Sequence, residues 1–192
     1  MRKIISKEDE GKKKRRNQFL VGGILILVMV MSTIGYSFTR DQQNNTGNPT
    51  MIYKGYTFTQ VSGFWNVNIG NAQFSFVYNP NETQKINLVL NPISNYSSKP
   101  LYIYSQDSSA EAEIYRNLFY QNKIVERVQD ACFSGETCDP SLPVKTCDDN
   151  FIIIEQSNST QITQNKNCVF IEGENNLTML SDSFLYKIIG LQ

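Results

Sequence analysis

The sequence predicts an α+β protein in which an N-terminal transmembrane helix precedes a domain outside the cytoplasm. Three observations predict this. The chain begins with basic residues, an uncharged apolar run follows them, and the later region contains strand patterns both before its first helical pattern and between its helical patterns. We divide the chain into a basic cytoplasmic tail at residues 1–17, a transmembrane helix at 18–39, a linker at 40–50 and an extracytoplasmic α+β domain at 51–192.

The tail and the apolar run together predict the orientation. Eight Lys/Arg lie within residues 1–16, whereas residues 41–192 carry nine basic and fifteen acidic residues. Positive charge beside an apolar segment favours a cytoplasmic N-terminus. No residue between Arg16 and Arg40 is charged, and about twenty residues at 1.5 Å each cross a hydrocarbon layer of about 30 Å. We therefore expect a single-pass protein of the cell membrane that contacts lipid through this helix.

A cleaved signal peptide is the alternative to the anchor. The small residues Ser32, Thr33 and Gly35 offer a cleavage site, but the apolar run is longer than is usual for a signal peptide and no A-x-A pattern follows. The basic cluster at residues 12–16 contains no aromatic residues for stacking on bases, so no nucleic-acid partner is expected.

The first part of the outer domain has the pattern of an antiparallel meander. Apolar and polar residues alternate near residues 56–59, 65–69 and 74–78, and the Gly70-Asn71 turn separates the last two of these segments. A fourth strand is expected at residues 86–90, after the turn residues that end the third.

The second part has strand-helix-strand elements. A strand at residues 101–104 precedes Ser108-x-x-Glu111, a capping box that opens a helix ending near Asn122. Residues 123–132 fit either a continuation of this helix or a strand returning beside the first.

Two more strands and a closing helix complete the domain. The strands are expected at residues 151–154 and 168–171. Apolar residues at helical spacing over residues 177–189 form one face of the helix, and Gly190 supplies its stop.

Spaced aromatic and turn residues in this domain carry a resemblance. They are Gly63-x-Trp65, Phe76-x-Tyr78-Asn79-Pro80, Asn167-Cys168-Val169-x-Ile171 and Ser181-Asp182-x-Phe184-Leu185-Tyr186. This pattern resembles a group of uncharacterised archaeal single-pass membrane-anchored proteins and covers most of residues 50–192. The resemblance implies a cell-envelope protein and supplies no catalytic residue.

All four cysteines lie in the predicted outer domain, where disulfides form. Of three connectivities we favour Cys147 with Cys168 and Cys132 with Cys138. The rival interpretation is a four-cysteine zinc site, but zinc ligands usually arrive as two close pairs, and the spacings here are five, eight and twenty intervening residues. We therefore expect neither a metal nor a cofactor.

Five Asn-x-Ser/Thr sequons begin at Asn44, Asn81, Asn95, Asn158 and Asn176. Asn44, Asn95 and Asn158 fall in predicted linkers or loops and are the preferred glycosylation candidates.

The absence of histidine excludes the commonest hydrolase designs and leaves carboxylate chemistry or Ser-Lys pairing. Two groups of residues are weak candidates for a site. Acidic residues could form an acid–base pair or a calcium site (Glu126, Asp130, Glu136, Asp139, Asp148, Asp149), and aromatic residues could form a platform for a sugar or a protein (Tyr96, Tyr102, Tyr104, Tyr115, Phe119, Tyr120). We favour a solvated surface for the acidic residues over an acid–base pair or a calcium site, and a packed core for the aromatic residues over a platform for a sugar or a protein. We assign no catalytic residue and expect an envelope protein that contacts a protein or glycan. A carboxylate-based envelope-modifying enzyme, such as a glycosidase, and a subunit of a membrane complex are the alternatives.

Overall fold

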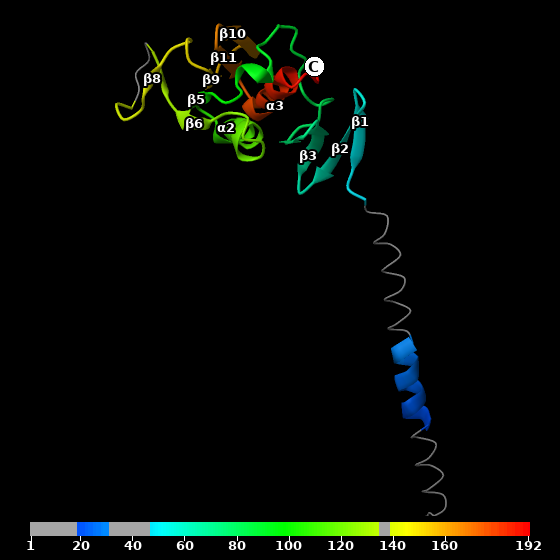
Figure 1. Cartoon of the computed structure of the whole chain (residues 1–192). Coiled ribbons are helices and arrows are strands. Elements are labelled where there is room, and N and C mark those ends of the chain that lie inside the picture. Colours follow the sequence, from blue (N-terminus) through cyan, green and yellow to red (C-terminus); the bar gives the residue numbers. More distant parts are fainter. Residues whose placement is uncertain (1–18, 31–46, 135–138) are drawn as a thin grey trace, which may run out of the picture. The chain divides into compact units, whose positions relative to one another are not determined.

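The computed structural model describes residues 19–30, 47–134 and 139–192 and divides the chain into two units, Met1–Gly47 and Asn48–Gln192 (Figure 1). In the first unit, residues 19–30 form a helix whose apolar side chains are largely exposed. The basic tail and the rest of the predicted membrane span lie outside the described residues. Within the described ranges, no helix is both long enough and apolar enough to cross a membrane.

The second unit is an α+β domain with an antiparallel sheet and a mixed sheet. The antiparallel sheet contains β1 (Thr50–Tyr53), β2 (Tyr56–Val61), β3 (Phe64–Ile69) and β4 (Ala72–Phe76). These strands pair in chain order, and short turns containing positive-φ residues join them, as the sharp reversal of a hairpin requires. The predicted meander is thus confirmed for β2, β3 and β4, whereas β1 was not predicted.

The strand expected at residues 86–90 does not form, because side chains from distant segments bind its backbone. The Ile86 N–H donates to Gln192 Oε1 at 3.1 Å, and the Ile86 carbonyl accepts from Lys187 Nζ at 2.9 Å. The backbone polar groups of Ile86 are therefore satisfied without a partner strand. Val89 is 90 % exposed, so the alternating pattern here does not mark a buried face.

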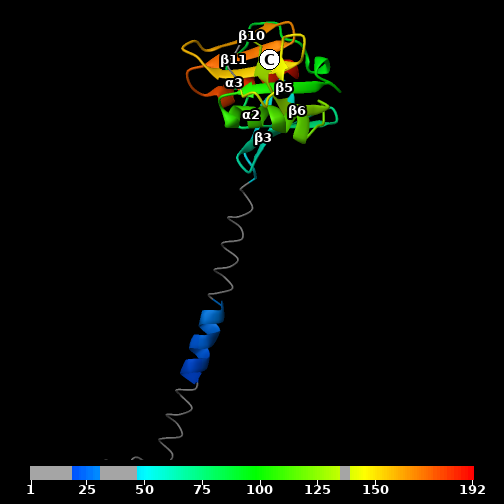
Figure 2. The ribbon, with the colours of Figure 1, turned by 90° about the vertical axis from the view of Figure 1, so that its left-hand side faces the viewer.

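The mixed sheet has the order β10-β11-β9-β5-β6 (Figure 1). Figure 2 shows β10 and β11 toward one edge of this sheet and β5 and β6 toward the other. Its strands are β5 (Pro100–Ser105), β6 (Arg127–Asp130), β9 (Phe151–Gln156), β10 (Gln161–Asn165) and β11 (Cys168–Gly173). Only the β10–β11 pair is antiparallel within this sheet. A small parallel pair, β7 (Cys132–Phe133) and β8 (Val144–Lys145), lies apart from both sheets.

The N-cap of the helix between β5 and β6 lies one residue before the predicted cap, Ser108. The side chain of Asp107, and not that of Ser108, accepts from the N–H groups of Ser109 and Ala110. Helix α2 (Ser108–Tyr115) continues as a π-helical turn, η3 (Arg116–Tyr120). Beyond it the chain returns as β6 beside β5, so the strand alternative for residues 123–132 is correct.

The last helix, α3 (Leu177–Ile188), lies between the two sheets (Figure 1). On one side the Tyr186 ring lies 4.1 Å from that of Phe76 in β4, and on the other α3 packs on β9 and β11. Gly190, with φ +84°, ends it as predicted. Because both sides are covered, the expectation of a single buried face is wrong: residues 180–186 are all buried. A short 3-10 turn, η2 (Ile93–Asn95), precedes β5.

Candidate functional site

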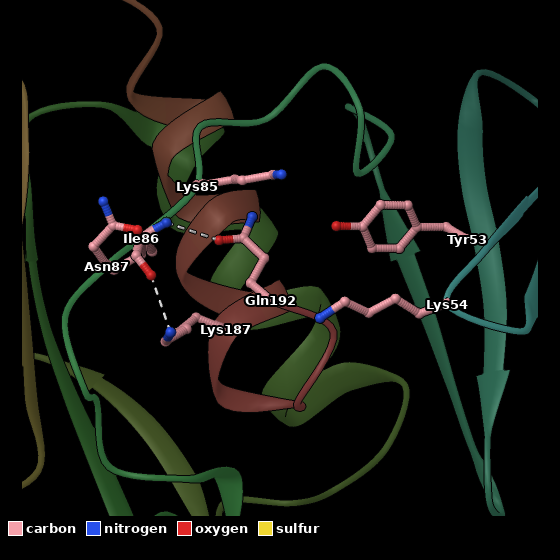
Figure 3. A pocket seen from close by; sticks show the side chains of 7 residues that line it. All are labelled: Tyr53, Lys54, Lys85, Ile86, Asn87, Lys187 and Gln192. Atoms are coloured by element: carbon pink, nitrogen blue, oxygen red, sulfur yellow. Dashed lines mark hydrogen bonds between the residues drawn. The ribbon is translucent and has the colours of Figure 1, made fainter.

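A pocket of about 320 Å³ opens between the β1–β2 hairpin, the loop after β4 and the C-terminal end of α3 (Figure 3). We call it the lysine pocket. Its lining consists of Tyr53, Lys54, Lys85, Ile86, Asn87, Lys187 and Gln192. Figure 3 shows the side chains of Tyr53, Lys54 and Lys85 pointing into the space between the hairpin and the helix.

The hairpin turn places two of these residues. Tyr53 pairs with Tyr56, and the two residues between them, Lys54 and Gly55, have φ values of 47° and 84°. Positive φ at both central positions is the type I′ geometry that suits the twist of paired strands. The turn therefore projects Lys54 from the tip of the hairpin, with Tyr53 directly before it.

The opposite wall is held by the end of the chain. Besides binding the backbone of Ile86, Gln192 donates from Nε2 to Gln84 O at 3.2 Å and to Thr83 Oγ1 at 3.3 Å. Lys187 donates to the carbonyl of Ile86. These bonds tie the loop that carries Lys85 to α3, so this wall is built from segments about one hundred residues apart in sequence.

The charged side chains of the lysine pocket are all basic. Three ammonium groups line it and none of its lining residues is acidic. The ion pairs between described residues join other side chains, such as Lys145 with Asp149 and Lys166 with Asp148. Within the described residues the side chains of Lys54 and Lys85 have no hydrogen-bond partner, so their donors face solvent. An anion is the ligand that such an arrangement attracts.

A second pocket, also of about 320 Å³, is lined by charged side chains of both signs. Its lining includes Tyr102 and Lys99 together with Asp148 and Asp149, and both aspartates form ion pairs with lysines. A hydrogen bond from Lys145 lowers the pKa of Tyr102, and a second from Arg127 acts in the same direction. Because both aspartates are already paired with lysines, we expect this pocket to attract an external ion less strongly than the lysine pocket does.

The favoured disulfide pair is present. Cys147 and Cys168 are bonded, with their Cα atoms 4.8 Å apart, and join the loop before β9 to the start of β11. Cys132 is not a free thiol. Its predicted partner, Cys138, lies outside the described residues.

The glycosylation candidates differ in accessibility. Asn158 is exposed in the turn between β9 and β10, whereas Asn95 is half-buried in η2. Asn44 lies outside the described residues. The less favoured sequon residues Asn81 and Asn176 are both exposed, the first in a turn and the second at the start of α3.

The acidic and aromatic residues singled out in the sequence come together only in part, since Tyr102, Asp148 and Asp149 line the second pocket. In the described part of the chain, no cluster of acidic or cysteine side chains has the arrangement of a metal site. Glu136 lies outside the described residues. Tyr96 and Tyr102 are buried, whereas Tyr115 and Tyr120 are 41 % and 68 % exposed, so the aromatic group is divided between core and surface.

Two buried carboxyl groups were not expected from the sequence. Glu113 in α2 is 1 % exposed and Asp182 in α3 is fully buried. Burial, reinforced by the charge of Glu113, raises the pKa of Asp182 to about 9. A glycosidase needs a pair of carboxyls that a substrate can reach. This pair is enclosed between helices, and no pattern in the sequence connects the two positions.

Comparisons with family models, curated proteins and solved structures found no match to this chain.

Proposed function

We propose that this chain is a membrane-anchored protein of the cell envelope whose outer domain binds an acidic protein or glycan through the lysine pocket. The observation that carries the proposal is the group of three ammonium ions, Lys54, Lys85 and Lys187, in a pocket lined by no acidic residue. Clefts lined by charge of one sign concentrate ligands of the opposite sign.

The placement of the domain outside the cytoplasm rests on sequence and covalent structure. Basic residues precede the apolar run, which favours a cytoplasmic N-terminus. The Cys147–Cys168 bond is of a kind that persists in oxidising compartments. The helix at residues 19–30 exposes apolar side chains of the kind that lipid accommodates.

Binding is favoured over catalysis by the nature of the groups that face solvent. The lysine pocket presents ammonium, phenol and amide groups, which recognise a ligand by charge and hydrogen bonds. The carboxyl pair that an acid–base mechanism would use, Glu113 and Asp182, is enclosed in the core. This buried pair therefore gives no support to a glycosidase activity.

Orientation is tested first, with the full chain in intact cells and a membrane-impermeant thiol reagent. We expect labelling of Cys147 and Cys168 only after reduction. Labelling that requires a broken membrane would overturn the outer placement.

Binding is tested with the full chain in lipid nanodiscs against three immobilised polymers: polyglutamate, polygalacturonate and neutral dextran. We expect retention on at least one acidic polymer, none on dextran, and loss of retention in the double variant Lys54→Gln/Lys85→Gln. The matched control is Lys99→Gln, an exposed lysine outside the pocket. Equal retention of the double variant and the control would contradict the proposal.

A further inference from the structure

We infer that the lysine pocket is a binding site for one anionic sugar residue, a sugar ring that carries a carboxylate or a phosphate. This inference rests on the proposed function and makes its ligand specific. It is carried by the combination of free cations, an aromatic ring and a free amide around one small cavity.

The size of the pocket limits the ligand. A volume of about 320 Å³ lies at the lower end of the range of about 300 to 1,000 Å³ for small-molecule sites. A single ring with one charged substituent suits such a volume. A helix or a folded segment of a partner does not fit it.

The cations divide into free groups and one fixed group. Lys187 Nζ is held by the Ile86 carbonyl at 2.9 Å, so it supplies charge from a defined position in the wall. Lys54 and Lys85 enter from opposite sides, one from the hairpin and one from the loop after β4 (Figure 3). Two ammonium groups that approach from different directions suit an anion with several oxygens, because each oxygen accepts a separate charge-assisted hydrogen bond.

The remaining lining suits a hydroxylated ring. The Tyr53 side chain is half-buried, and its hydroxyl points into the space that Lys85 also enters (Figure 3). Within the described residues, neither the Tyr53 hydroxyl nor the Asn87 amide makes a hydrogen bond. A phenol and an amide provide both donors and acceptors, as sugar hydroxyls require, and the apolar part of the Tyr53 ring offers a surface to the face of a sugar.

One wall of the site is held in place by the protein itself. Gln192 uses both of its amide atoms on the loop backbone, so the position of the loop does not depend on a bond to a ligand. A preformed site avoids the cost of ordering a loop at the moment of binding.

The test is calorimetric titration of the full chain, in nanodiscs or in a detergent whose headgroup is not a sugar. The probes are glucuronate, glucose 6-phosphate, neutral glucose, acetate and inorganic phosphate. We expect saturable binding of glucuronate or glucose 6-phosphate, and no binding of glucose. Binding of only one of the two identifies the source of the anion, a uronic acid or a phosphorylated sugar.

Each of Lys54→Gln and Lys85→Gln should weaken that binding by about fivefold, because one ammonium beside an anion in water contributes about 1 kcal/mol. Lys99→Gln should leave it unchanged, and the thermal midpoints of all three should match the unsubstituted chain.

Two results would overturn the inference. One is equal binding of acetate or inorganic phosphate, which would show that the ring is not recognised. The other is no saturable binding of either anionic sugar. If the acidic polymers are still retained through Lys54 and Lys85, the proposed function stands and only the sugar assignment fails.

Discussion

Asp182 of α3 and Glu113 of α2 bring their carboxyl groups together inside the domain. Arg116 Nη2 lies 2.6 Å from Glu113 Oε1, and the Tyr78 N–H donates to Asp182 Oδ2 at 2.9 Å. Asp182 Oδ1 has no hydrogen-bond partner when both carboxyl groups are ionised. A proton on Asp182 resolves this, because it donates to Glu113. The raised pKa of Asp182, about 9, describes the same state: burial and the charge of Glu113 keep Asp182 neutral at pH 7.

The first prediction concerns pH and Asp182→Asn. An unfolded Asp has a pKa of about 3.9, so the folded domain binds one more proton than the unfolded chain between about pH 4 and pH 9. The protonated Asp182 contributes its full stabilisation of the folded domain below about pH 4, and this stabilisation is lost as pH rises through about 9. Asn keeps the shape and donates to Glu113 without a proton to lose. We expect Asp182→Asn to gain in relative stability with rising pH, by at most about 1.4 kcal/mol per unit.

Urea unfolding of the full chain at several pH values between 5 and 9 measures this difference. Asp148→Asn is the control, because Asp148 is exposed and its pair with Lys166 contributes about 0 to 1 kcal/mol. Parallel curves for the unsubstituted chain and Asp182→Asn would show that Asp182 is already ionised in the folded domain.

The sequence predicted most of the elements whose pattern is local. Strands β2, β3 and β4 show period-2 alternation between turn residues, and α3 shows helical spacing up to Gly190. Strand β10 was missed because its residues, Gln161–Asn165, are mostly polar and form an edge of the mixed sheet. An edge strand that is half-exposed lacks the apolar signal on which such predictions depend.

The candidate site was beyond sequence reasoning for a different reason. Lys54, Lys85 and Lys187 are separated by thirty or more residues and belong to no motif. Their proximity depends on how the hairpin, the loop and α3 pack. The cysteine pairing was easier to predict, because a cysteine outside the cytoplasm usually bonds to another cysteine and the chain has only four.

The second prediction concerns the outer edge of β4, which is covered by the side chains of Asn117 in η3 and of Asn122, two residues beyond η3. Asn117 accepts from the Ser75 N–H at 2.8 Å and donates to the Ser75 carbonyl at 2.8 Å, as a neighbouring strand would. Asn122 binds the N–H and carbonyl of Gln73 in the same manner. The Ser75 carbonyl also accepts from Arg116 Nη1 at 3.2 Å, so Asn117→Ala leaves only the Ser75 N–H without a partner. Because Asn117 is fully buried, we expect this change to cost about 1–3 kcal/mol.

Asn122→Ala is the matched variant, since its bonds are near solvent and water can replace them. We expect it to lower the free energy of unfolding by less than about 1 kcal/mol. Chemical unfolding of both variants measures the difference, and equal losses would show that burial does not determine the effect.

The third prediction concerns the Cys147–Cys168 bond. It closes a loop with a sequence separation of 21, and in the chain-entropy account this stabilises the fold by about 3 kcal/mol by restricting the unfolded chain. The double variant Cys147→Ala/Cys168→Ala should therefore unfold at a lower temperature than the unsubstituted chain. Addition of a reductant should lower the thermal midpoint of the unsubstituted chain further than that of the variant. A midpoint unaffected by the substitution would mean that the bond contributes little to the stability of the domain.

The fourth prediction connects a backbone conformation to ligand binding. Gly55 has φ +84°, and no heavy atom lies within 4 Å of the place that a Cβ would occupy, so Gly55→Ala meets no clash and is penalised only by its backbone conformation. That penalty is about 1 to 2 kcal/mol for an L-residue held at positive φ. Part of it is relieved if the turn shifts, and a shifted turn displaces Lys54. We expect weaker retention on the acidic polymer together with a small loss of stability.

Gly47→Ala, which also meets no neighbouring atom and lacks a positive φ, is the control for both measurements. If Gly55→Ala lost stability but kept full retention, the position of Lys54 would not matter to the ligand, and the contribution of the hairpin to the lysine pocket would be refuted.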